Sequence, residues 1–114
     1  MKCPPSMREK ERYIVFHVIS ENNRKFSYKE ILNAIMHSII LTIGIINSAK
    51  AFLYLIEWNE EKNFGIFRTT NKFNSYVIFA ISLISQINGI KVSFNTLKTC
   101  GTIKKAREFI RKNF

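Results

Sequence analysis

Residues 51–70 read AFLYLIEWNEEKNFGIFRTT, and this stretch decides the fold. Its first eight and last seven residues are mostly aromatic, β-branched or otherwise apolar, a composition that suits the pleated surface of a β-sheet. The five residues between these runs, 59–63, are polar and have the length of a hairpin connection. We therefore predict strands over residues 51–58 and 64–70, joined as a β-hairpin.

The chain before this hairpin predicts a strand followed by a helix. Residues 13–19 are a short apolar run, typical of a buried strand. Ser27 and Glu30 have the spacing of a capping box, in which the Ser side chain accepts a backbone N–H and the Glu side chain reaches back. Apolar residues recur at helical spacing from Tyr28 to Ile43, and Gly44 is the expected end of this helix.

The chain after the hairpin predicts a second helix and a fourth strand. Asn74 or Ser75 is the expected N-cap of the helix, which should close at the Asn-Gly pair of residues 88–89. The apolar face of this helix is expected to hold Val77, Ile81, Ile84 and Ile87. Residues 90–97 are the expected strand, and the Gly-Thr pair of residues 101–102 should open a last helix that runs to the C-terminus.

This order of elements, β-α-β-β-α-β with a terminal helix, is the ferredoxin-like or split βαβ order. It predicts an α/β fold of the α+β type, a two-layer sandwich that resembles an RNA-recognition motif. The 114 residues suit one domain that spans residues 1–114, in which we expect residues 1–11 to be a mobile tail.

The charge of the chain predicts an anionic partner. The formal net charge is +10, and residues 91–114 alone carry +6. A balance this basic indicates binding to nucleic acid or to an acidic membrane surface. The chain has no Asp, and its eight acidic residues are all Glu, mostly within charged runs. This leaves poor material for an acid–base or metal site, so we expect no catalytic residues.

The predicted last helix carries the most informative charges. Lys104 and Lys105 lie in its first turn, where the helix dipole disfavours cations by about 0.3–1 kcal/mol each. Nothing nearby in the sequence offsets this cost, so we infer that both lysines serve a partner. Free N–H groups and two lysines at a helix start suit a phosphate. The alternative is a solvated basic face, in which Arg107 and Arg111 continue the stripe.

The third predicted strand falls where an RNA-recognition motif carries its base-stacking aromatics. Phe64 takes the first stacking position, but Ile66 takes the second, and Thr69 stands at the later aromatic position. We therefore favour the interpretation that Phe64 and Ile66 cover the core or a subunit interface. Arg68 and Lys72 can still hold phosphates at the end of this strand.

Two charge-free runs, residues 31–49 and 73–90, approach the length of a membrane span. Asn, Ser and other polar residues interrupt both runs. We therefore expect a helix buried on one face, followed by a turn, in each run, and no membrane span.

The histidines and cysteines predict neither a metal site nor a disulfide bond. His17 lies in an apolar strand and is expected to be a hydrogen-bonded core residue, whereas His37 is expected to be exposed. Together with Cys3 and Cys100 these residues lack the spacing of zinc ligands. A reduced, intracellular chain is the better interpretation of the two cysteines.

Four stretches of the chain resemble the archaeal ribonuclease P protein component 2 family, which is shared with a eukaryotic ribonuclease P and MRP subunit. They are residues 12–16, 54–55, 65–68 and 100–106, in order and at the right spacings, and the resemblance covers roughly residues 8–110. The last stretch resembles the Ser-Gly-Thr-Ile-Lys/Arg-Lys signature of the family, with Cys100 in place of the usual Ser. A second departure is the expected loop over residues 46–48, which is poorer in glycine than the family leads us to expect.

This resemblance implies a non-catalytic subunit of an endoribonuclease whose RNA removes the 5′ leader of precursor tRNA. The RNA would carry the magnesium-dependent hydrolysis, and the chain itself would bind no cofactor. The implied partners are ribonuclease P RNA, ribonuclease P protein component 3 and other holoenzyme proteins, with a homodimer inside a heterotetramer. Precursor tRNA would be met through the complex. The implied location is the cytoplasm, or the nucleus of a eukaryote, and the short chain favours an archaeal source.

Carried onto this sequence, the resemblance and the charge pattern select eight RNA-binding positions. The first four are Arg68, Lys104, Lys105 and Arg107, and four more follow from charge alone, Arg12, Lys72, Lys98 and Arg111. Hydrophobic residues on the sheet face are the expected protein contacts. Two alternatives remain: a general single-stranded RNA-binding module, and a ferredoxin-like regulatory or scaffold domain.

Overall fold

The computed structural model describes residues 10–114, so most of the predicted mobile tail lies outside the described residues. Glu11, the last residue of that predicted tail, belongs instead to the first strand. In chain order the elements are β1 (Glu11–Ser20), the short 3-10 helix η2 (Glu21–Asn23), α1 (Tyr28–Lys50), β2 (Tyr54–Asn59), β3 (Phe64–Thr70), α2 (Asn74–Ser82), β4 (Gln86–Ile87), β5 (Ile90–Cys100) and α3 (Ile103–Asn113).

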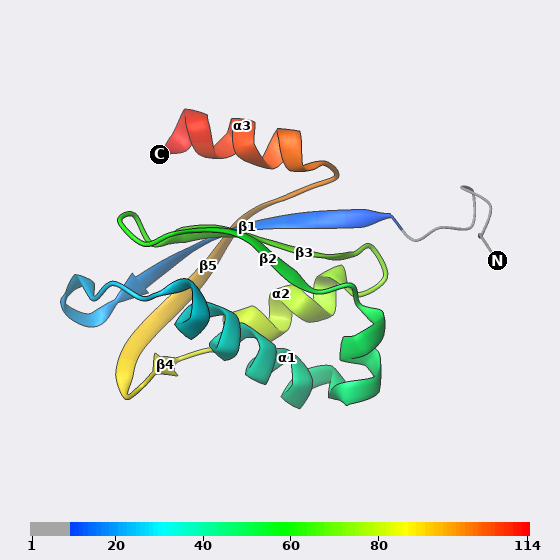
Figure 1. The fold of residues 1–114 in the computed structure, drawn as a ribbon, viewed down its shortest axis with the longest axis horizontal. Helices are drawn as coiled ribbons and strands as arrows, with labels where there is room; N and C mark the ends of the chain where they lie inside the picture. The colour runs from blue at the N-terminus through cyan, green and yellow to red at the C-terminus, as the bar shows by residue number, and fades with distance from the viewer. Residues whose placement is uncertain (1–9) are drawn as a thin grey trace.

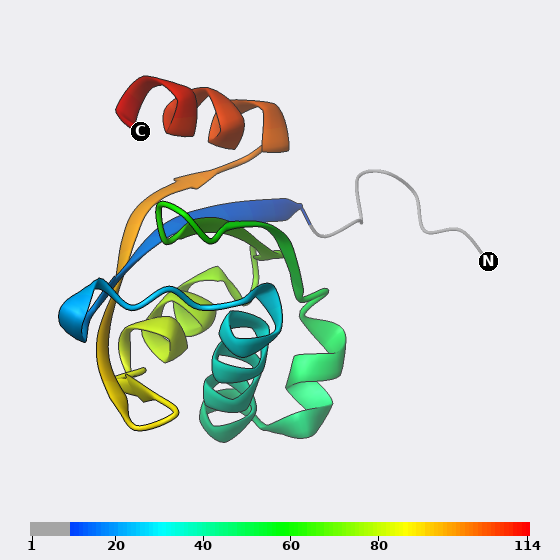
Figure 2. The same ribbon diagram turned by 60° about the vertical axis from the view of Figure 1, so that its left-hand side comes forward.

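One curled antiparallel sheet, in the order β2-β3-β1-β5-β4, forms the middle of the molecule (Figure 1). β1 pairs with β3 on one side and with β5 on the other, which is the ferredoxin-like arrangement. Helices α1 and α2 cover one face of this sheet, which we call the inner face. Helix α3 covers the opposite, outer face, as the turned view shows most clearly (Figure 2). The predicted fold class is confirmed.

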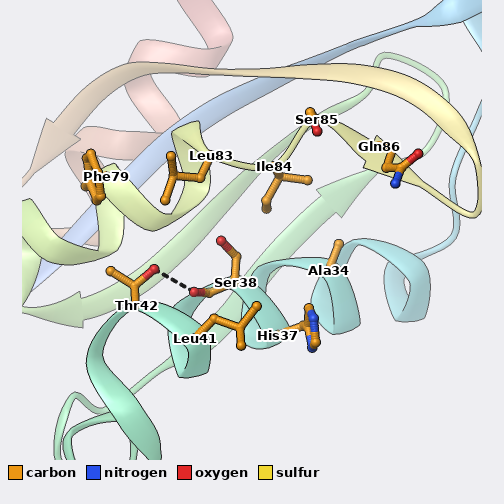
Figure 3. A pocket seen from close by; sticks show the side chains of 10 residues that line it. All are labelled: Ala34, His37, Ser38, Leu41, Thr42, Phe79, Leu83, Ile84, Ser85 and Gln86. Atoms are coloured by element: carbon orange, nitrogen blue, oxygen red, sulfur yellow. Dashed lines mark hydrogen bonds between the residues drawn. The ribbon is translucent and has the colours of Figure 1, made fainter.

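Helices α1 and α2 lie against each other below the inner face. The Ser38 hydroxyl of α1 donates a hydrogen bond of 2.6 Å to the Ala80 carbonyl oxygen of α2. At one end of this contact is a pocket of about 530 Å³, with Leu41 on one wall and Phe79 and Leu83 on the other (Figure 3). All three of these side chains are more than half exposed, so the outward surface of the helix pair is apolar.

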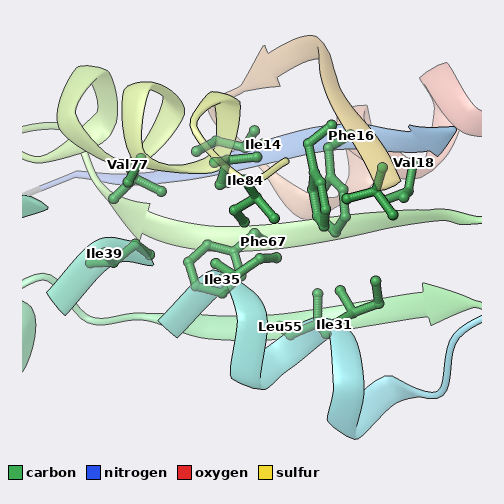
Figure 4. Close-up of a cluster of buried hydrophobic side chains, with 14 of the residues drawn as sticks. Ile14, Phe16, Val18, Ile31, Ile35, Ile39, Leu55, Phe67, Val77 and Ile84 are labelled. Atoms are coloured by element: carbon green, nitrogen blue, oxygen red, sulfur yellow. The ribbon is translucent and has the colours of Figure 1, made fainter. Parts of the chain in front are cut away.

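The main core fills the space between the inner face and the two helices (Figure 4). Alternate residues of β1 point into it, because successive side chains of a strand point to opposite faces. Ile14, Phe16 and Val18 are buried in this way, and Phe67 of β3 lies beside them. Helix α1 contributes the buried residues Ile31, Ile35 and Ile39, which follow the spacing expected of one helix face.

Helix α1 passes Gly44, where the sequence predicts its end. Gly44 does leave the helical conformation, with φ of 84°, but the helix resumes and runs to Lys50. The Ser48 hydroxyl donates to the Gly44 carbonyl oxygen at 2.7 Å and closes the turn after the kink. Residues 46–48 are therefore helical rather than a loop, and β2 begins at Tyr54 instead of residue 51.

The predicted second helix is too long at its C-terminal end, and its predicted cap is wrong. Phe73 is the N-cap of α2 and makes no side-chain cap hydrogen bond, and the helix ends at Ser82. Asn88 and Gly89, with φ of 51° and 80°, form the turn between β4 and β5. Positive φ at both central residues is what a tight hairpin requires, and Asn-Gly is the strongest short signal for it. Ile84 and Ile87 remain in the main core, as the sequence predicts, but from outside the helix.

Helix α1 is long and apolar enough, by length and composition alone, to cross a membrane, with a mean hydropathy of 1.7 over its best window. The core helix of a soluble protein satisfies the same criterion. In this chain the helix buries Ile31, Ile35 and Ile39 against the sheet and is broken at Gly44. These features agree with the prediction of a helix buried on one face.

Candidate nucleic-acid interface

Helix α3 is held on the outer face by a second, smaller apolar cluster. Val15, Ile66 and Cys100 of the sheet are buried there against Ala106 of the helix. Because Cys100 belongs to this cluster, the departure from the family's Ser affects the packing of α3. The N-cap of α3 is Thr102, whose hydroxyl accepts a hydrogen bond of 3.2 Å from the Lys105 N–H.

The end of α3 covers the surface on which an RNA-recognition motif would stack bases. The Phe114 ring stacks on Phe64 with 4.5 Å between the ring centroids, and it lies 5.8 Å from the half-buried ring of His17. Phe64 is 8% exposed and Ile66 is fully buried. The interpretation that both residues cover apolar structure is confirmed, whereas His17 lies below α3 instead of in the main core. Val15 and Ile66 are buried below α3 and are not open to other proteins, whereas Ile19 and Leu97 are exposed hydrophobes of the sheet strands, so the expected protein contacts of the sheet stay a prediction.

Lys104 and Lys105 are both exposed in the first turn of α3. That turn contains no acidic residue, so the unfavourable interaction of the two cations with the helix dipole stays uncompensated, as the sequence predicts. The Thr102 cap takes the Lys105 N–H, so the arrangement combines two exposed cations with the N–H groups of Ile103 and Lys104, which lie ahead of the first intrahelical hydrogen bond. Phosphate oxygens are the anions that such a helix start binds.

The start of α3 lies at the same end of the sheet as the start of β1 and the ends of β3 and β5 (Figure 1). The strand register places Tyr13 opposite Arg68 on one side and opposite Cys100 on the other. Arg12 reaches the start of α3, with its Nη1 atom 3.9 Å from the position that a Cβ atom would take on Gly101. We call Arg12, Arg68, Lys104 and Lys105 the basic end.

Arg68 is held in place by aromatic residues. Its guanidinium carbon lies 3.8 Å from the centroid of the Phe52 ring and 5.2 Å from that of Tyr54. Its Nε donates a hydrogen bond of 3.4 Å to the Phe52 carbonyl oxygen. Neither aromatic residue was a predicted site residue, because the strand pattern of residues 51–58 gives no sign that their rings would meet Arg68.

A groove of about 510 Å³ runs beside α3, between the helix and the end of β5. Lys98 and Lys105 line it, and the sequence selects both for RNA binding. Lys112, which it does not select, lines the same groove. The Lys98 ammonium group lies 5.7 Å from the centroid of the Phe109 ring. The groove extends the positive surface along the helix from the basic end.

The other predicted RNA-binding residues are placed differently. Arg107 forms an ion pair with Glu57 of β2, with 2.6 Å between Nε and Oε1, so it fastens α3 to the sheet. Arg111 is exposed in the last turn of α3. Lys72 follows the end of β3, beside Phe73 and facing α1, so it lies at the same end of the sheet but toward the helices of the inner face. Of the eight residues selected by sequence, the structure brings Arg12, Arg68, Lys104 and Lys105 together at one end.

Histidine, cysteine and acidic residues do not gather into a possible metal site within residues 10–114. His37 is exposed at the rim of the pocket between α1 and α2, as predicted. Cys100 is buried below α3, and Cys3 lies outside the described residues.

Comparison with known proteins finds one family over most of the chain. The family model described as Rpp14/Pop5 matches residues 12–111. Ribonuclease P protein component 2 of Thermococcus gammatolerans is 40% identical over 91% of this chain and 85% of its own length. The protein of the same name from Pyrococcus furiosus is 40% identical over 97% of this chain and 91% of its own length.

More distant comparisons agree. Ribonuclease P protein component 2 of Methanococcus aeolicus is 35% identical over 92% of this chain and 75% of its own length. Among solved structures, a chain in the cryo-EM structure of yeast ribonuclease MRP has the same fold. The TM-score is 0.68 at 9% identity, and the match covers 94% of this chain and 95% of that chain.

Proposed function

The chain belongs to the Rpp14/Pop5 family as a protein subunit of ribonuclease P, and we propose that it binds and stabilises the RNA of that endoribonuclease through the basic end. The observation that carries this proposal is the uncompensated pair Lys104 and Lys105 at the start of α3. Arg12 and Arg68 add two charges at the same end of the sheet. Together these groups offer cations and N–H donors to neighbouring phosphates.

In this proposal the chain positions RNA and does no bond-breaking chemistry. The RNA subunit supplies the magnesium-dependent hydrolysis that removes the 5′ leader from precursor tRNA, and the chain binds no cofactor. Lysine and arginine on phosphates hold an RNA fold in register without reading its sequence, and they release counterions as they bind. This role suits a surface that is rich in cations and poor in acidic groups.

The two alternative functions receive less support. A general single-stranded RNA-binding module would stack bases on the sheet, but Phe64 is covered by Phe114. A regulatory or scaffold domain of the same fold would explain the sheet and helices. It would leave the net charge of +6 in residues 91–114 without a purpose.

We also propose that the outward surface of α1 and α2 contacts ribonuclease P protein component 3, within a heterotetramer that contains two copies of this chain. Large apolar side chains are exposed on this surface: Leu41, Ile45, Ile46, Tyr76, Phe79 and Leu83. Contiguous exposed apolar residues mark protein-binding sites. The complex would reside in the cytoplasm of an archaeal cell, or in the nucleus of a eukaryote.

Reconstitution of precursor-tRNA cleavage from the RNA and protein subunits tests the main proposal. Omission of this chain should lower cleavage. Replacement of Lys104 and Lys105 by Gln should weaken binding to ribonuclease P RNA and reduce the slope of log affinity against log salt by about one to two units. Lys62→Gln with Lys91→Gln removes two exposed charges from the opposite end of the sheet and is the matched control. An equal loss of slope in the control would contradict the assignment to the basic end.

The protein contact has its own test. Leu41→Glu with Phe79→Glu should abolish co-purification with protein component 3 and leave the salt slope of RNA binding unchanged. Leu97→Glu, at an exposed position of β5 away from the helix pair, is the control. Loss of co-purification in the control alone would move the contact to β5.

A further inference from the structure

We propose that Phe52, Tyr54 and Arg68 form a stacking platform for an unpaired nucleobase of the RNA, at the edge of the sheet next to the basic end. The proposal rests on RNA binding by the basic end and specifies which part of the RNA this edge takes. The platform joins two aromatic rings to one guanidinium group, and both kinds of group stack on bases.

The two aromatic residues of the platform are about half exposed. Phe52 is 48% exposed and Tyr54 is 51% exposed, and neither belongs to the main core or to the small cluster below α3. Tyr54 opens β2, which is the edge strand of the sheet. Burial, and after it the neighbouring Tyr54, raises the pKa of Tyr28, whose hydroxyl donates to the carbonyl oxygen of Leu55, the residue after Tyr54. The packing of the chain therefore leaves both rings available.

The backbone of Phe52 has a conformation that bulky residues rarely adopt. Its φ is 55°, in the left-handed region that disfavours bulky side chains. The neighbouring residues hold this conformation: the buried Thr69 hydroxyl donates to the Ala51 carbonyl oxygen at 2.9 Å, and Arg68 donates to that of Phe52. Such strain persists where its surroundings fix it, and it concentrates at functional sites. Phe52 directly follows Ala51, the C-cap of α1, where a left-handed residue commonly ends a helix, so the helix end accounts for its φ. The half-exposed ring beside Arg68 is the feature that a base can use.

Arg68 gives the platform its charge. Its guanidinium carbon lies 3.8 Å from the Phe52 ring centroid. Within residues 10–114, Arg68 forms no ion pair with a carboxylate. The ion pair in this part of the chain joins Arg107 to Glu57. The planar guanidinium can therefore donate to a phosphate while it stacks on an aromatic ring. A nucleotide supplies both groups, a phosphate and a flat base.

The platform lies in line with the phosphate-binding start of α3. The register across the sheet runs from Tyr54 to Arg68, Tyr13 and Cys100, which spans three strand spacings or about 14 Å. Lys104 and Lys105 follow shortly after Cys100. A single RNA strand that crosses this line can place phosphates on the lysines and a base on the platform. Because α3 covers Phe64, this edge replaces the usual stacking surface of the fold.

Binding of a fluorescently labelled oligouridine octamer to the full chain tests the platform, with an RNA duplex of the same length for comparison. The octamer should bind more tightly than the duplex, because only unpaired bases offer a free face. Phe52→Asn should weaken octamer binding about 5- to 150-fold, as expected for the loss of one stacked base, with an unchanged salt slope. Its melting temperature should stay the same or rise, because Asn tolerates a positive φ.

Matched variants separate the platform from the basic end. Phe79→Asn removes an equally exposed ring from α2 and should leave octamer binding unchanged. Lys104→Gln with Lys105→Gln should reduce the salt slope and leave the preference for the octamer over the duplex intact. Tyr54→Leu should weaken octamer binding in the same direction as Phe52→Asn.

Several results would overturn the platform. The first is that the unchanged chain does not bind the octamer, or binds octamer and duplex with equal affinity. The second is that Phe52→Asn leaves octamer binding unaffected. The third is that Phe52→Asn loses binding to protein component 3 while its octamer binding stays normal. If these variants fail while the Lys104 and Lys105 variant still weakens ribonuclease P RNA binding, the proposed function stands without the platform. If no variant changes binding to that RNA, the proposed function itself fails.

Discussion

Both sides of the sheet bury apolar residues under helices, but the helices on the two sides present different chemistry to solvent. Residues 31–49 and 73–90, which build most of α1 and α2, contain no charged residue. Helix α3 has six charged residues among its eleven. The outward surfaces, rather than the surfaces that face the sheet, therefore distinguish the side proposed to bind protein from the side proposed to bind RNA.

The two sides also differ in how much structure they bury. The main core includes buried residues from all five strands and from α1 and α2, whereas the cluster below α3 is built around Val15, Ile66, Cys100 and Ala106. Since hydrophobic stabilisation scales with the apolar area removed from water, the inner side should carry most of the stability. Helix α3 should then be able to loosen without unfolding the rest of the domain.

The largest effect is expected for Phe67→Ala in the main core. Phe67 is fully buried between β3 and α1, so truncation should lower the free energy of unfolding by about 3–5 kcal/mol. Denaturant unfolding followed by circular dichroism measures this change. Phe79→Ala, an exposed aromatic of α2, is the control and should change stability by less than about 0.5 kcal/mol. A loss below about 1 kcal/mol at Phe67 would mean that the inner side does not dominate stability.

A smaller and more local effect is expected for Ala106→Asp on the outer side. Ala106 is fully buried, and a carboxyl group there, held neutral and without a hydrogen-bond partner, should cost about 1–3 kcal/mol of the free energy that holds α3 on the sheet. Hydrogen exchange should quicken in α3 and remain slow in β1. Lys112→Gln, an exposed position on the same helix, should leave both rates unchanged. Equal quickening in α3 and β1 would show that the two sides unfold together.

The N-cap hydrogen bonds of α1 and α3 allow a comparison between the inner and the outer side. Ser27 accepts from the Glu30 N–H at 3.2 Å, and Thr102 accepts from the Lys105 N–H at 3.2 Å. Each replacement by Ala should cost about 0.5–2 kcal/mol. Ser27→Ala should lower global stability in a denaturant titration, whereas Thr102→Ala should appear mainly as faster exchange in α3. Global destabilisation by Thr102→Ala alone would reverse this ranking.

Low pH should destabilise the inner side through protonation of the Glu30 carboxylate. The backbone N–H of Ser27 donates to its carboxylate, and this lowers the pKa of Glu30 in the folded chain. A carboxylate with a lowered pKa stabilises the fold above its unfolded pKa, and the contribution is lost as the pH falls through the folded pKa. Glu30→Gln should therefore flatten the loss of stability below the ordinary range of glutamate. An unchanged acid limb in a pH series of denaturant titrations would remove Glu30 from this role.

The smallest effect is expected for the pair of Arg107 and Glu57. Both side chains are about half exposed, so solvent screens their attraction. A double-mutant cycle with Arg107→Gln and Glu57→Gln should give a coupling of about 0.2–1 kcal/mol that shrinks in high salt. A salt-independent coupling would indicate a more buried contact than the structure has.

Local signals in the sequence predicted the inner side well. Strand 64–70 and the capping box of Ser27 and Glu30 are confirmed without change, because each depends on residues close together in the chain. The predictions were wrong where tertiary packing selected one of two structures that the local sequence allows. Helix α1 continues past Gly44, and the Asn-Gly pair at 88–89 turns a hairpin instead of ending a helix, since β4 finds a partner in β5.

The residues of the candidate site also fall into two groups, those that the local sequence could select and those that it could not. Lys104 and Lys105 could be selected from sequence, because a helix start and its dipole are local features. The partners of Arg107 and Arg68 could not. Glu57 lies 50 residues from Arg107 in the chain, and the Phe52 carbonyl 16 residues from Arg68. No periodicity links such positions. The strand register brings Arg68 to β2, and the packing of α3 on the outer face brings Arg107 to Glu57.

The sequence by itself determined the family, the basic start of the last helix and the order of the main elements, without the short elements η2 and β4. Only the tertiary structure decided that α3 lies on the outer face, where it covers Phe64 and leaves Phe52 and Tyr54 exposed. The physical reason is that strand and helix signals act over a few residues, whereas the choice of which face a helix covers depends on apolar area contributed by strands far apart in the chain.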